Sequence, residues 1–334
     1  MKKVIPSFIL LILILCACSP SSYSYSDDFF AMDTYMTLTA NGVDAEIAVK
    51  KAEKEVQRLE GLLSAHDKKS EVYKLNKKGS GKLSDDTLAV LKKAIEYNKL
   101  TNGTLNPTML QITELWGFPS GNYRVPEKSE ISNALNLARP DKISIKNNEV
   151  EFKTDGIKVD LGAIAKGYTS SKIVEIFKKN GIESGIINLG GNVQTLGTKP
   201  DGSLWTVAIE NPDEGGDYLG ALKVKDKAVV TSGGYERNFT KGGKTYHHIL
   251  NPENGYPAES GLSSVTVVCD DGTLSDALST SLFVMGKNKA VKFYKESDKD
   301  FDIILYTNDG KLYVSQGIAD NFNSQLNFEI IKKD

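Results

Sequence analysis

The side chains best suited to do chemistry lie in two stretches that are far apart in the sequence. The first is residues 159–168 (Val-Asp-Leu-Gly-Ala-Ile-Ala-Lys-Gly-Tyr), in which Asp160 precedes Gly162 and Lys166 follows that glycine by one helical turn. A carboxylate, a glycine that lets backbone come close and a lysine suit an anionic ligand that carries a metal ion. We therefore expect this stretch to form half of a binding site.

The second stretch is residues 275–280 (Ser-Asp-Ala-Leu-Ser-Thr), in which Asp276 and Thr280 stand four residues apart. In a helix, residues at this spacing project from the same face. Carboxylate and hydroxyl oxygens are suitable ligands for a hard cation such as Mg²⁺. Such a pair is by itself usually solvated surface, and a lysine after a strand-turn-helix is common, so the prediction of one site depends on both stretches together.

Two adjacent histidines are the third chemical feature. His247 and His248 follow a glycine pair within residues 231–237 and precede a turn-rich loop, residues 251–257. The pKa of histidine lies near neutrality, so a histidine held at the entry of this loop is a candidate general base. Neighbouring histidines without a cysteine cluster do not indicate a zinc site, and one of the pair is expected to be an exposed strand residue.

The pattern of apolar residues predicts the elements that must position these groups. Helices and strands do not alternate regularly, which favours an α+β fold with mixed or antiparallel sheets and packed helices over a doubly wound sheet. The expected helices are residues 44–63, 85–100, 126–137, 163–180, 273–284 and 289–296. The expected strands are residues 29–40, 157–160, 185–189, 204–210, 220–224, 228–232, 262–269, 301–307 and 312–315, with a hairpin at 143–153.

Three connecting segments are predicted to be loops, and each has an ordinary and a functional interpretation. The polar residues 64–76 form a solvated loop or face a ligand. The Trp-Gly-Phe turn in residues 115–119 is a small hydrophobic cluster or covers an aromatic ligand. The glycine pair in residues 190–192 only turns the chain, or lets backbone amides approach a phosphate.

The composition excludes one class of partner. The chain has 334 residues with 41 basic and 43 acidic side chains, so its net charge is -2. Since no basic stripe interleaved with aromatic residues is present, we expect no nucleic-acid surface. The length allows one large domain or two, with a sizeable core.

The N-terminus predicts export. An apolar run, residues 4–17, follows Lys2 and Lys3 and is too short to span a bilayer comfortably, which takes about 20 apolar residues. It is typical of a secretory signal peptide, residues 1–17. The alternative is an uncleaved anchor, and in both cases the folded part is expected outside the cytoplasm and attached to a membrane.

The end of the apolar run predicts a lipid anchor. Leu15-Cys16-Ala17-Cys18 resembles a bacterial lipobox, so Cys18 is expected to be the lipidated first residue, with palmitate among its acyl chains. Residues 18–28 would then tether a domain, residues 29–334, to the extracytoplasmic side of the cell membrane. Cys269 would be left without a disulfide partner in the chain, and in an apolar strand it is expected to be a small core residue.

With these motifs in order, the sequence resembles the ApbE family, the FAD:protein FMN transferases. Single blocks would be weak evidence, but eight in the expected order cover nearly the whole mature chain. The blocks are Ala31-Met32 with Thr34, then residues 64–76, 115–118, 160–168, 188–191, 231–237, 248–257 and 275–280.

The resemblance implies an ApbE-like (T-fold-like) architecture and a membrane-tethered enzyme that binds FAD and Mg²⁺. Such an enzyme moves FMN from FAD onto a threonine of an acceptor protein, which would be a membrane redox subunit, and releases AMP. The metal would be held by Asp276, Thr280 and the backbone carbonyl of Ala163. The residues expected to contact FAD are Met32, His66 in place of a family tyrosine, Thr104, Leu105, Asn106, Asp160, Lys166 and His248.

The chemistry of the implied reaction agrees with these residues. FAD carries two negative charges on its pyrophosphate, so Mg²⁺ with Lys166 nearby would neutralise the charge that develops as AMP leaves. The attacking threonine hydroxyl must lose a proton. His248 is the base we expect, with Asp160 and Asp276 as competitors.

The sequence departs from the family pattern at several positions, and it leaves rival activities open. Asparagine keeps the hydrogen-bonding ability of aspartate but loses its charge, so these positions are expected to orient a loop or the flavin without assisting the metal. The rivals are an Mg²⁺-dependent FAD pyrophosphatase that gives FMN and AMP, and a lipid-anchored protein that binds flavin without chemistry. Aspartate is replaced at Asn106, Asn192, Gly234 and Asn251, and threonine is replaced at Asn254.

Overall fold

The computed structural model describes residues 23–213 and 217–333. The expected signal peptide and Cys18 lie outside this part of the chain. Within it, none of the helices combines the length and the apolar character needed to cross a bilayer.

A large sheet forms the centre of the described chain. Nine strands pair in the order β1-β2-β6-β7-β10-β13-β14-β15-β17, and every pair is antiparallel except β15 with β17. This agrees with the α+β class expected from the sequence. The strands are β1 (Ser24–Ala31), β2 (Thr34–Asn41), β6 (Ser184–Leu189), β7 (Asn192–Leu196), β10 (Ala228–Gly233), β13 (Leu262–Cys269), β14 (Asp302–Thr307), β15 (Leu312–Ser315) and β17 (Phe328–Ile331).

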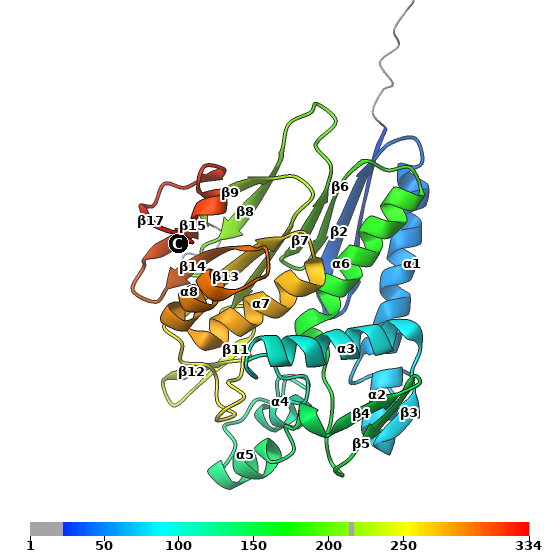
Figure 1. The fold of residues 1–334 in the computed structure, drawn as a ribbon, viewed down its shortest axis with the longest axis vertical. Helices are drawn as coiled ribbons and strands as arrows, with labels where there is room; N and C mark the ends of the chain where they lie inside the picture. Colours follow the sequence, from blue (N-terminus) through cyan, green and yellow to red (C-terminus); the bar gives the residue numbers. More distant parts are fainter. Residues whose placement is uncertain (1–22, 214–216, 334) are drawn as a thin grey trace, which may run out of the picture.

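Three helices cover one face of this sheet: α1 (Ala45–Leu63), α6 (Gly162–Lys179) and α7 (Gly272–Met285). In Figure 1, α1 and α6 lie side by side over β2 and β6, and α7 lies over β13 next to α6. Helix α1 buries its apolar residues at three- and four-residue steps, as the sequence predicts. Helix α7 is buried on nearly every side, which explains how it carries small polar residues and still packs on both α6 and the sheet.

The opposite face of the sheet is covered at its C-terminal end by a smaller sheet. Its strands are β16 (Phe322–Asn323), β9 (Tyr218–Val224) and β8 (Trp205–Glu210). Val207 and Leu222 from these strands pack in one cluster with Val268 and Ile304 of the central sheet. Two further helices, α8 (Lys287–Glu296) and α9 (Gln316–Ala319), lie near β14 and β15.

The remaining elements lie below the helices in the view of Figure 1. They are α2 (Glu71–Lys78), α3 (Asp85–Leu100), α4 (Leu110–Trp116), α5 (Lys128–Leu135), the sheet of β3 (Ser80–Lys82), β5 (Glu149–Phe152) and β4 (Ile143–Lys146), and the hairpin of β11 (Asn238–Lys241) and β12 (Lys244–His247).

The structure corrects the expected single strand at residues 29–40. Two strands, β1 and β2, pair as a hairpin in which Ala31 lies opposite Thr34. Met32 and Asp33 form the turn with φ values of 49° and 59°, a left-handed conformation that no apolar pattern announces. Because β1 begins at Ser24, the end of the tether expected at residues 18–28 belongs instead to the central sheet.

Three other expectations about local structure are wrong. Residues 157–160 do not form a strand, because the Asn76 side chain takes the place of a neighbouring strand: its amide donates to Val159 O at 2.8 Å and accepts from Val159 N at 2.7 Å. The polar loop expected at residues 64–76 contains α2, which Ser70 caps by accepting from Tyr73 N. Trp116 ends helix α4 rather than standing in an irregular turn.

Candidate active site

Helices α6 and α7 cross in contact at two glycines, and this crossing brings the two chemical stretches together. A Cβ atom added at Gly167 would lie 2.1 Å from the carbonyl oxygen of Gly272. A Cβ atom added at Gly272 would lie 2.7 Å from the carbonyl oxygen of Gly167. Such distances leave no room for any side chain at either position. The close approach therefore requires glycine in both helices.

Asp276 is buried at this crossing and is anchored to α6. Its Oδ2 accepts a hydrogen bond of 2.8 Å from the backbone N–H of Gly167. Burial raises the pKa of Asp276 to about 6, although the positive charge of Lys166 and the Gly167 N–H both oppose this rise. A cation bound here would displace the proton of this carboxyl group. The raised pKa therefore marks Asp276 as a candidate cation ligand.

The other two expected metal ligands lie close to this bond. Ala163 lies one helical turn before Gly167 on α6, so its carbonyl points toward the region of the N–H that Asp276 accepts from. Thr280 lies one turn after Asp276 on α7, and its hydroxyl is 3.3 Å from that of Ser232 on β10. The three expected ligands thus come from the facing sides of α6 and α7.

Asn192 marks an unsatisfied position beside Asp276. It is the first residue of β7 and only 1% exposed, and both atoms of its amide lack a hydrogen-bond partner of good geometry among the described residues. It lies close enough to the Asp276 carboxylate to lower the pKa of that group slightly. Buried polar atoms without partners are rare in folded proteins and are expected where a ligand or ion binds.

Lys166 and Glu236 extend the site toward the turn between β6 and β7. The Lys166 Nζ atom is 3.4 Å from the carbonyl oxygen of Gly190 in that turn. The Glu236 side chain reaches solvent, but the protein atoms around it desolvate the carboxyl group and raise its pKa. The positive charges of Lys166 and Arg237 oppose this rise. Sequence reasoning gave Glu236 no role, and the only available signal was its place in the block of residues 231–237.

His248 comes directly after β12 and has a defined tautomer. Its Nδ1 lies 3.2 Å from the carbonyl oxygen of Arg237, and since a carbonyl can only accept, Nδ1 carries the proton. The Nε2 atom therefore has a free lone pair. Burial and the nearby charges of Arg237 and Lys166 lower the pKa of His248 to about 4, although its bond to the Arg237 carbonyl opposes this change, so the imidazole is neutral at physiological pH.

Asp160 lies at the start of α6 and next to the loop that follows α3. Its Oδ1 accepts from Gly162 N at 2.9 Å, and its own N–H donates to Pro107 O at 2.8 Å. Asn106 is therefore adjacent to Asp160. The side chain of Asn106 is already engaged, because its Oδ1 accepts from both the N–H and the hydroxyl of Thr108.

The other residues expected to contact FAD are placed less directly. Met32 packs on α6, where its Sδ lies 3.9 Å from the Thr169 hydroxyl. Leu105 is 3% exposed and belongs to the core, and its N–H and carbonyl are bonded to the side chains of Thr101 and Asn98. Thr104 bonds back to the end of α3, and His66 is exposed with its N–H directed to Ser64. The roles expected for these residues stay predictions.

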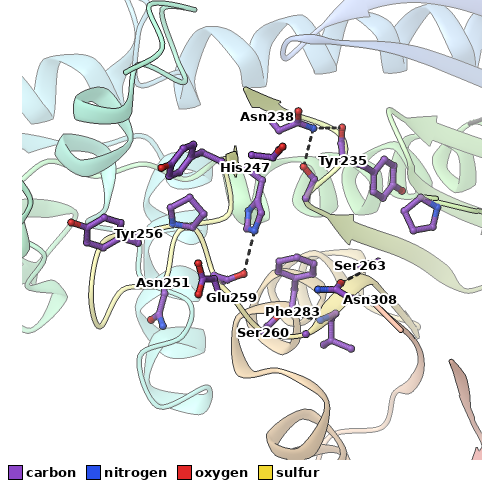
Figure 2. A pocket seen from close by; sticks show the side chains of 18 of the residues that line it. Tyr235, Asn238, His247, Asn251, Tyr256, Glu259, Ser260, Ser263, Phe283 and Asn308 are labelled. Carbon is purple, nitrogen blue, oxygen red and sulfur yellow. Dashed lines mark hydrogen bonds between the residues drawn. The ribbon is translucent and has the colours of Figure 1, made fainter. Parts of the chain in front are cut away.

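Residues of the hairpin of β11 and β12 line a large cavity that the sequence did not indicate. The cavity has a volume of about 910 Å³ and is lined by His247 rather than by His248. Figure 2 shows the ring of His247 near the centre of its wall, with Tyr256 and Tyr235 on either side. Successive residues of a strand face opposite sides, which places the two histidines in different environments.

The fold and the site together define the class of the protein as a mixed α+β enzyme with a buried carboxylate, a lysine and a neutral histidine gathered around the start of α6. Comparison with known proteins is more specific. The chain belongs to the ApbE family, whose model matches residues 32–305. This confirms the resemblance noted in the sequence.

Relatives and solved structures agree with this membership. The chain is 32% identical to the FAD:protein FMN transferase of Klebsiella pneumoniae over 267 residues, which is 78% of this chain and 82% of the relative. It is 31% identical to that of Treponema pallidum over 284 residues, 79% of this chain and 78% of the relative. The crystal structure of the ApbE protein of Thermotoga maritima superimposes with a TM-score of 0.83 at 31% identity, covering 88% of this chain and 98% of that one. The flavin transferase ApbE of Vibrio cholerae gives 0.79 at 27% identity with the same coverage.

Proposed function

We propose that this protein transfers FMN from FAD to a threonine hydroxyl of an acceptor protein and releases AMP, with Mg²⁺ bound at the crossing of α6 and α7. Relatives that share about three quarters of the chain are FAD:protein FMN transferases, which supports the flavin transfer. The observation that carries the assignment of the site is the buried Asp276 carboxylate bonded to Gly167 across the two helices.

The residues at this crossing fit a magnesium ion. Asp276, Thr280 and the carbonyl of Ala163 offer the hard oxygen ligands that this ion prefers. The Asn192 amide beside them lacks a hydrogen-bond partner of good geometry among the described residues, so its oxygen would be available to the ion or to a water bound to it. When bound, the ion supplies positive charge that offsets the charge growing on the pyrophosphate as AMP leaves.

Lys166 and the glycine turn would hold the pyrophosphate. Gly190 and Gly191 have positive φ values of 62° and 83°, and the Lys166 ammonium lies against the first of them. The N–H of Gly191 donates to Asn188 Oδ1 at 3.1 Å, so the positive charge of Lys166 is the main attraction that this turn offers to the pyrophosphate. Met32, Asp160 and the loop of residues 104–106 would contact the rest of the dinucleotide.

In the reaction, the oxygen of the acceptor hydroxyl forms a bond to the phosphorus of the FMN half, and the bond from that phosphorus to the AMP oxygen breaks. The hydroxyl proton passes to Nε2 of His248, whose other nitrogen is held by Arg237 O. The two negative charges of the pyrophosphate would offset Lys166 and Arg237, so FAD binding should raise the pKa of His248 toward its ordinary value. Asp160 is the competing base, but its Oδ1 is occupied by Gly162 N.

The anchor belongs to the same proposal. Cys18 would be acylated and would hold the enzyme at the extracytoplasmic face of the membrane, where it meets a membrane-bound redox acceptor. Only residues 19–23 separate Cys18 from the first residue of β1, so the folded part would stay close to the lipid surface.

The test measures both fates of FAD with the full chain purified in detergent. FAD and Mg²⁺ are incubated with and without a flavin-accepting protein domain, and covalent fluorescence on a denaturing gel is followed together with free FMN. If the protein transfers FMN, covalent fluorescence appears only when the acceptor is present. Asp276→Ala abolishes this fluorescence while FAD still binds. Asp270→Ala is the matched control, because that exposed aspartate pairs with Lys227 at the protein surface. Free FMN released at the same rate in both tubes would identify a pyrophosphatase instead.

A further inference from the structure

The edge of β12 that faces away from β11 has unpaired backbone groups where it borders the cavity. His248 N–H donates to Arg237 O at 3.0 Å, so the backbone of His248 faces the β11 side. Along a strand, the backbone groups of successive residues point to opposite edges. Those of Thr245 and His247 therefore point to the outer edge, and both residues line the cavity.

One short segment already pairs with this outer edge, but it stops before it reaches His247. Ala258 N–H donates to Ile249 O at 3.0 Å, and the chain then leaves β12 so that residues 258–263 form the far wall of the cavity. Among residues 23–213 and 217–333, no backbone group bonds to the outward N–H and C=O groups of Thr245 and His247. Open space and unpaired strand groups thus lie next to each other.

We propose that this edge binds an extended segment of the acceptor protein, which adds to the β11–β12 hairpin as a third strand. The inference rests on the proposed flavin transfer and names the surface that the protein substrate uses. An exposed strand edge is a ready template for such pairing, and main-chain hydrogen bonds supply affinity without strict demands on side chains.

The charges around the cavity indicate the chemistry of the segment. Lys244 and Glu259 neutralise each other at the rim, with Nζ and Oε1 2.6 Å apart. Asp213 accepts from the Tyr306 hydroxyl at 2.8 Å. The other polar side chains of the wall are uncharged, which favours an acceptor segment of small, uncharged polar residues. They are Asn238, Thr245, Asn251, Asn254, Ser260, Ser263 and Asn308.

The position of this edge connects it to the chemistry. His247 lines the cavity and the next residue is His248, while Gly234 and Tyr235 line it and the next residue is Glu236. A segment seated along the edge therefore runs along residues that directly precede, in the chain, two groups of the candidate site. This location suits a substrate whose hydroxyl must reach the flavin phosphate from outside.

The test removes one outward N–H without disturbing the hairpin. Thr245→Pro deletes a donor on the outer edge, where proline is tolerated because the ladder with β11 does not use that N–H. The matched control is Thr240→Pro, since Thr240 is the cross-strand partner of Thr245 and its N–H points to the opposite edge. Both variants lose the same contact of 3.1 Å between the two hydroxyls.

The full chain is assayed with FAD, Mg²⁺ and a purified flavin-accepting protein domain. Thr245→Pro should raise the KM for that domain by about fivefold or more, the effect of one lost hydrogen bond and a disturbed strand, with the Kd for FAD unchanged. Thr240→Pro should leave both constants unchanged. In the unsubstituted protein, the amides of Thr245 and His247 should exchange more slowly with deuterium when the acceptor is added.

Three results would overturn this inference. The first is an unchanged KM for the acceptor in Thr245→Pro, and the second is an equal rise of that KM in both proline variants. The third is a rise in the Kd for FAD in place of the KM for the acceptor, which would assign the cavity to the flavin. These results leave the proposed function standing, because the wild-type chain still transfers FMN in each. Failure of the wild-type chain to label the acceptor would instead refute the flavin transfer itself.

Discussion

The backbone N–H of Gly167 donates to Asp276 Oδ2 at 2.8 Å, and this bond joins two segments that are more than a hundred residues apart. It forms only because α6 and α7 approach each other without intervening side chains. The bond also orients the carboxylate toward the first turn of α6, where Ala163 and Lys166 lie. The packing of the two helices and the chemistry of the site therefore depend on each other.

Replacing Gly167 by alanine should break this arrangement. The new Cβ would meet Gly272 O at 2.1 Å and the Cβ of Asp276 at 2.7 Å, and neither atom is the end of a flexible side chain. Overpacking of this kind typically costs about 1–3 kcal/mol. We expect a lower free energy of unfolding in urea and little transfer activity. Gly61→Ala in α1 is the control, because its Cβ would meet open space and should stabilise the helix by about 0.5–1 kcal/mol.

Asp276→Asn should stabilise the metal-free protein while abolishing transfer. The pKa of Asp276 is about 6 in the folded protein and has its usual value of 3.8 in the unfolded chain. The protonated form therefore adds to the free energy of unfolding, fully below pH 3.8, and this contribution is lost as the pH rises through 6. Asparagine can still accept from Gly167 N without the buried charge. In EDTA at pH 7.5 the variant should gain about 2–3 kcal/mol in the free energy of unfolding.

The pH dependence provides the check on this second prediction. Urea unfolding of both proteins in EDTA should give a difference that is nearly constant above about pH 6.5 and shrinks as the pH falls from 6 to 4.5. A constant difference across that range would mean that Asp276 titrates normally and is not buried as a charge.

His248→Ala should lower kcat/KM for transfer by a similar factor at every pH between 6 and 9. The pKa of His248 is lowered to about 4, so the imidazole is already neutral over this range in the free enzyme. Loss of a general base typically costs about 10²–10⁴-fold.

A binding measurement separates the two roles open to His248. If it is the base, kcat should fall while the Kd for FAD, followed by flavin fluorescence, stays within a small factor of the wild-type value. A Kd that rises by the same factor as the loss in kcat/KM would assign His248 to FAD binding. A wild-type titration of kcat/KM near pH 6.5 that disappears in the variant would contradict the lowered pKa.

Much of the fold follows from local patterns. The helix over residues 85–100 and the strands over residues 262–269 and 312–315 have the predicted bounds, because their apolar periodicity is strong and polar residues end them. Cys269 is buried in β13 as expected for a core residue.

Elements that depend on distant partners were missed. Strand β7 carries the buried polar residues Gln194 and Thr195, and no local pattern distinguishes it from a loop.

The hairpin of β11 and β12 shows the same limit. Its tip, Gly242-Gly243, is polar and exposed, and its stability comes from outside its own sequence. Phe239 and Tyr246 stack with ring centroids 5.3 Å apart, and both pack on Trp116. Such aromatic packing needs the tertiary structure, so the short alternating run at residues 238–247 gave no prediction of strands.

The candidate site could be predicted as a set of residue types but not as a geometry. Asp276, Thr280 and Lys166 were selected from the sequence because their chemistry suits a metal and a phosphate. Glu236 was given no role, and Asn192 was expected only to orient a loop or the flavin without assisting the metal, because neither has a spacing relation to the motifs. Their proximity arises from the turn after β6 and from the end of β10, which only the folded sheet brings to α6.

Asn192→Asp should make stability strongly dependent on magnesium. Asn192 is buried beside Asp276 without a partner of good geometry among the described residues, so a second carboxylate there would repel the first. In EDTA at pH 7.5 the variant should have a lower Tm than the wild type, by about 2 °C or more. Millimolar Mg²⁺ should reverse this loss, because both carboxylates then face a cation.

The matched control is Gln194→Glu, two residues further along β7, where the glutamine side chain accepts from the Ser170 hydroxyl at 2.7 Å. The charge added there should destabilise the protein with or without Mg²⁺. An equal rise in Tm on adding Mg²⁺ in Asn192→Asp and the wild type would place the metal away from Asp276.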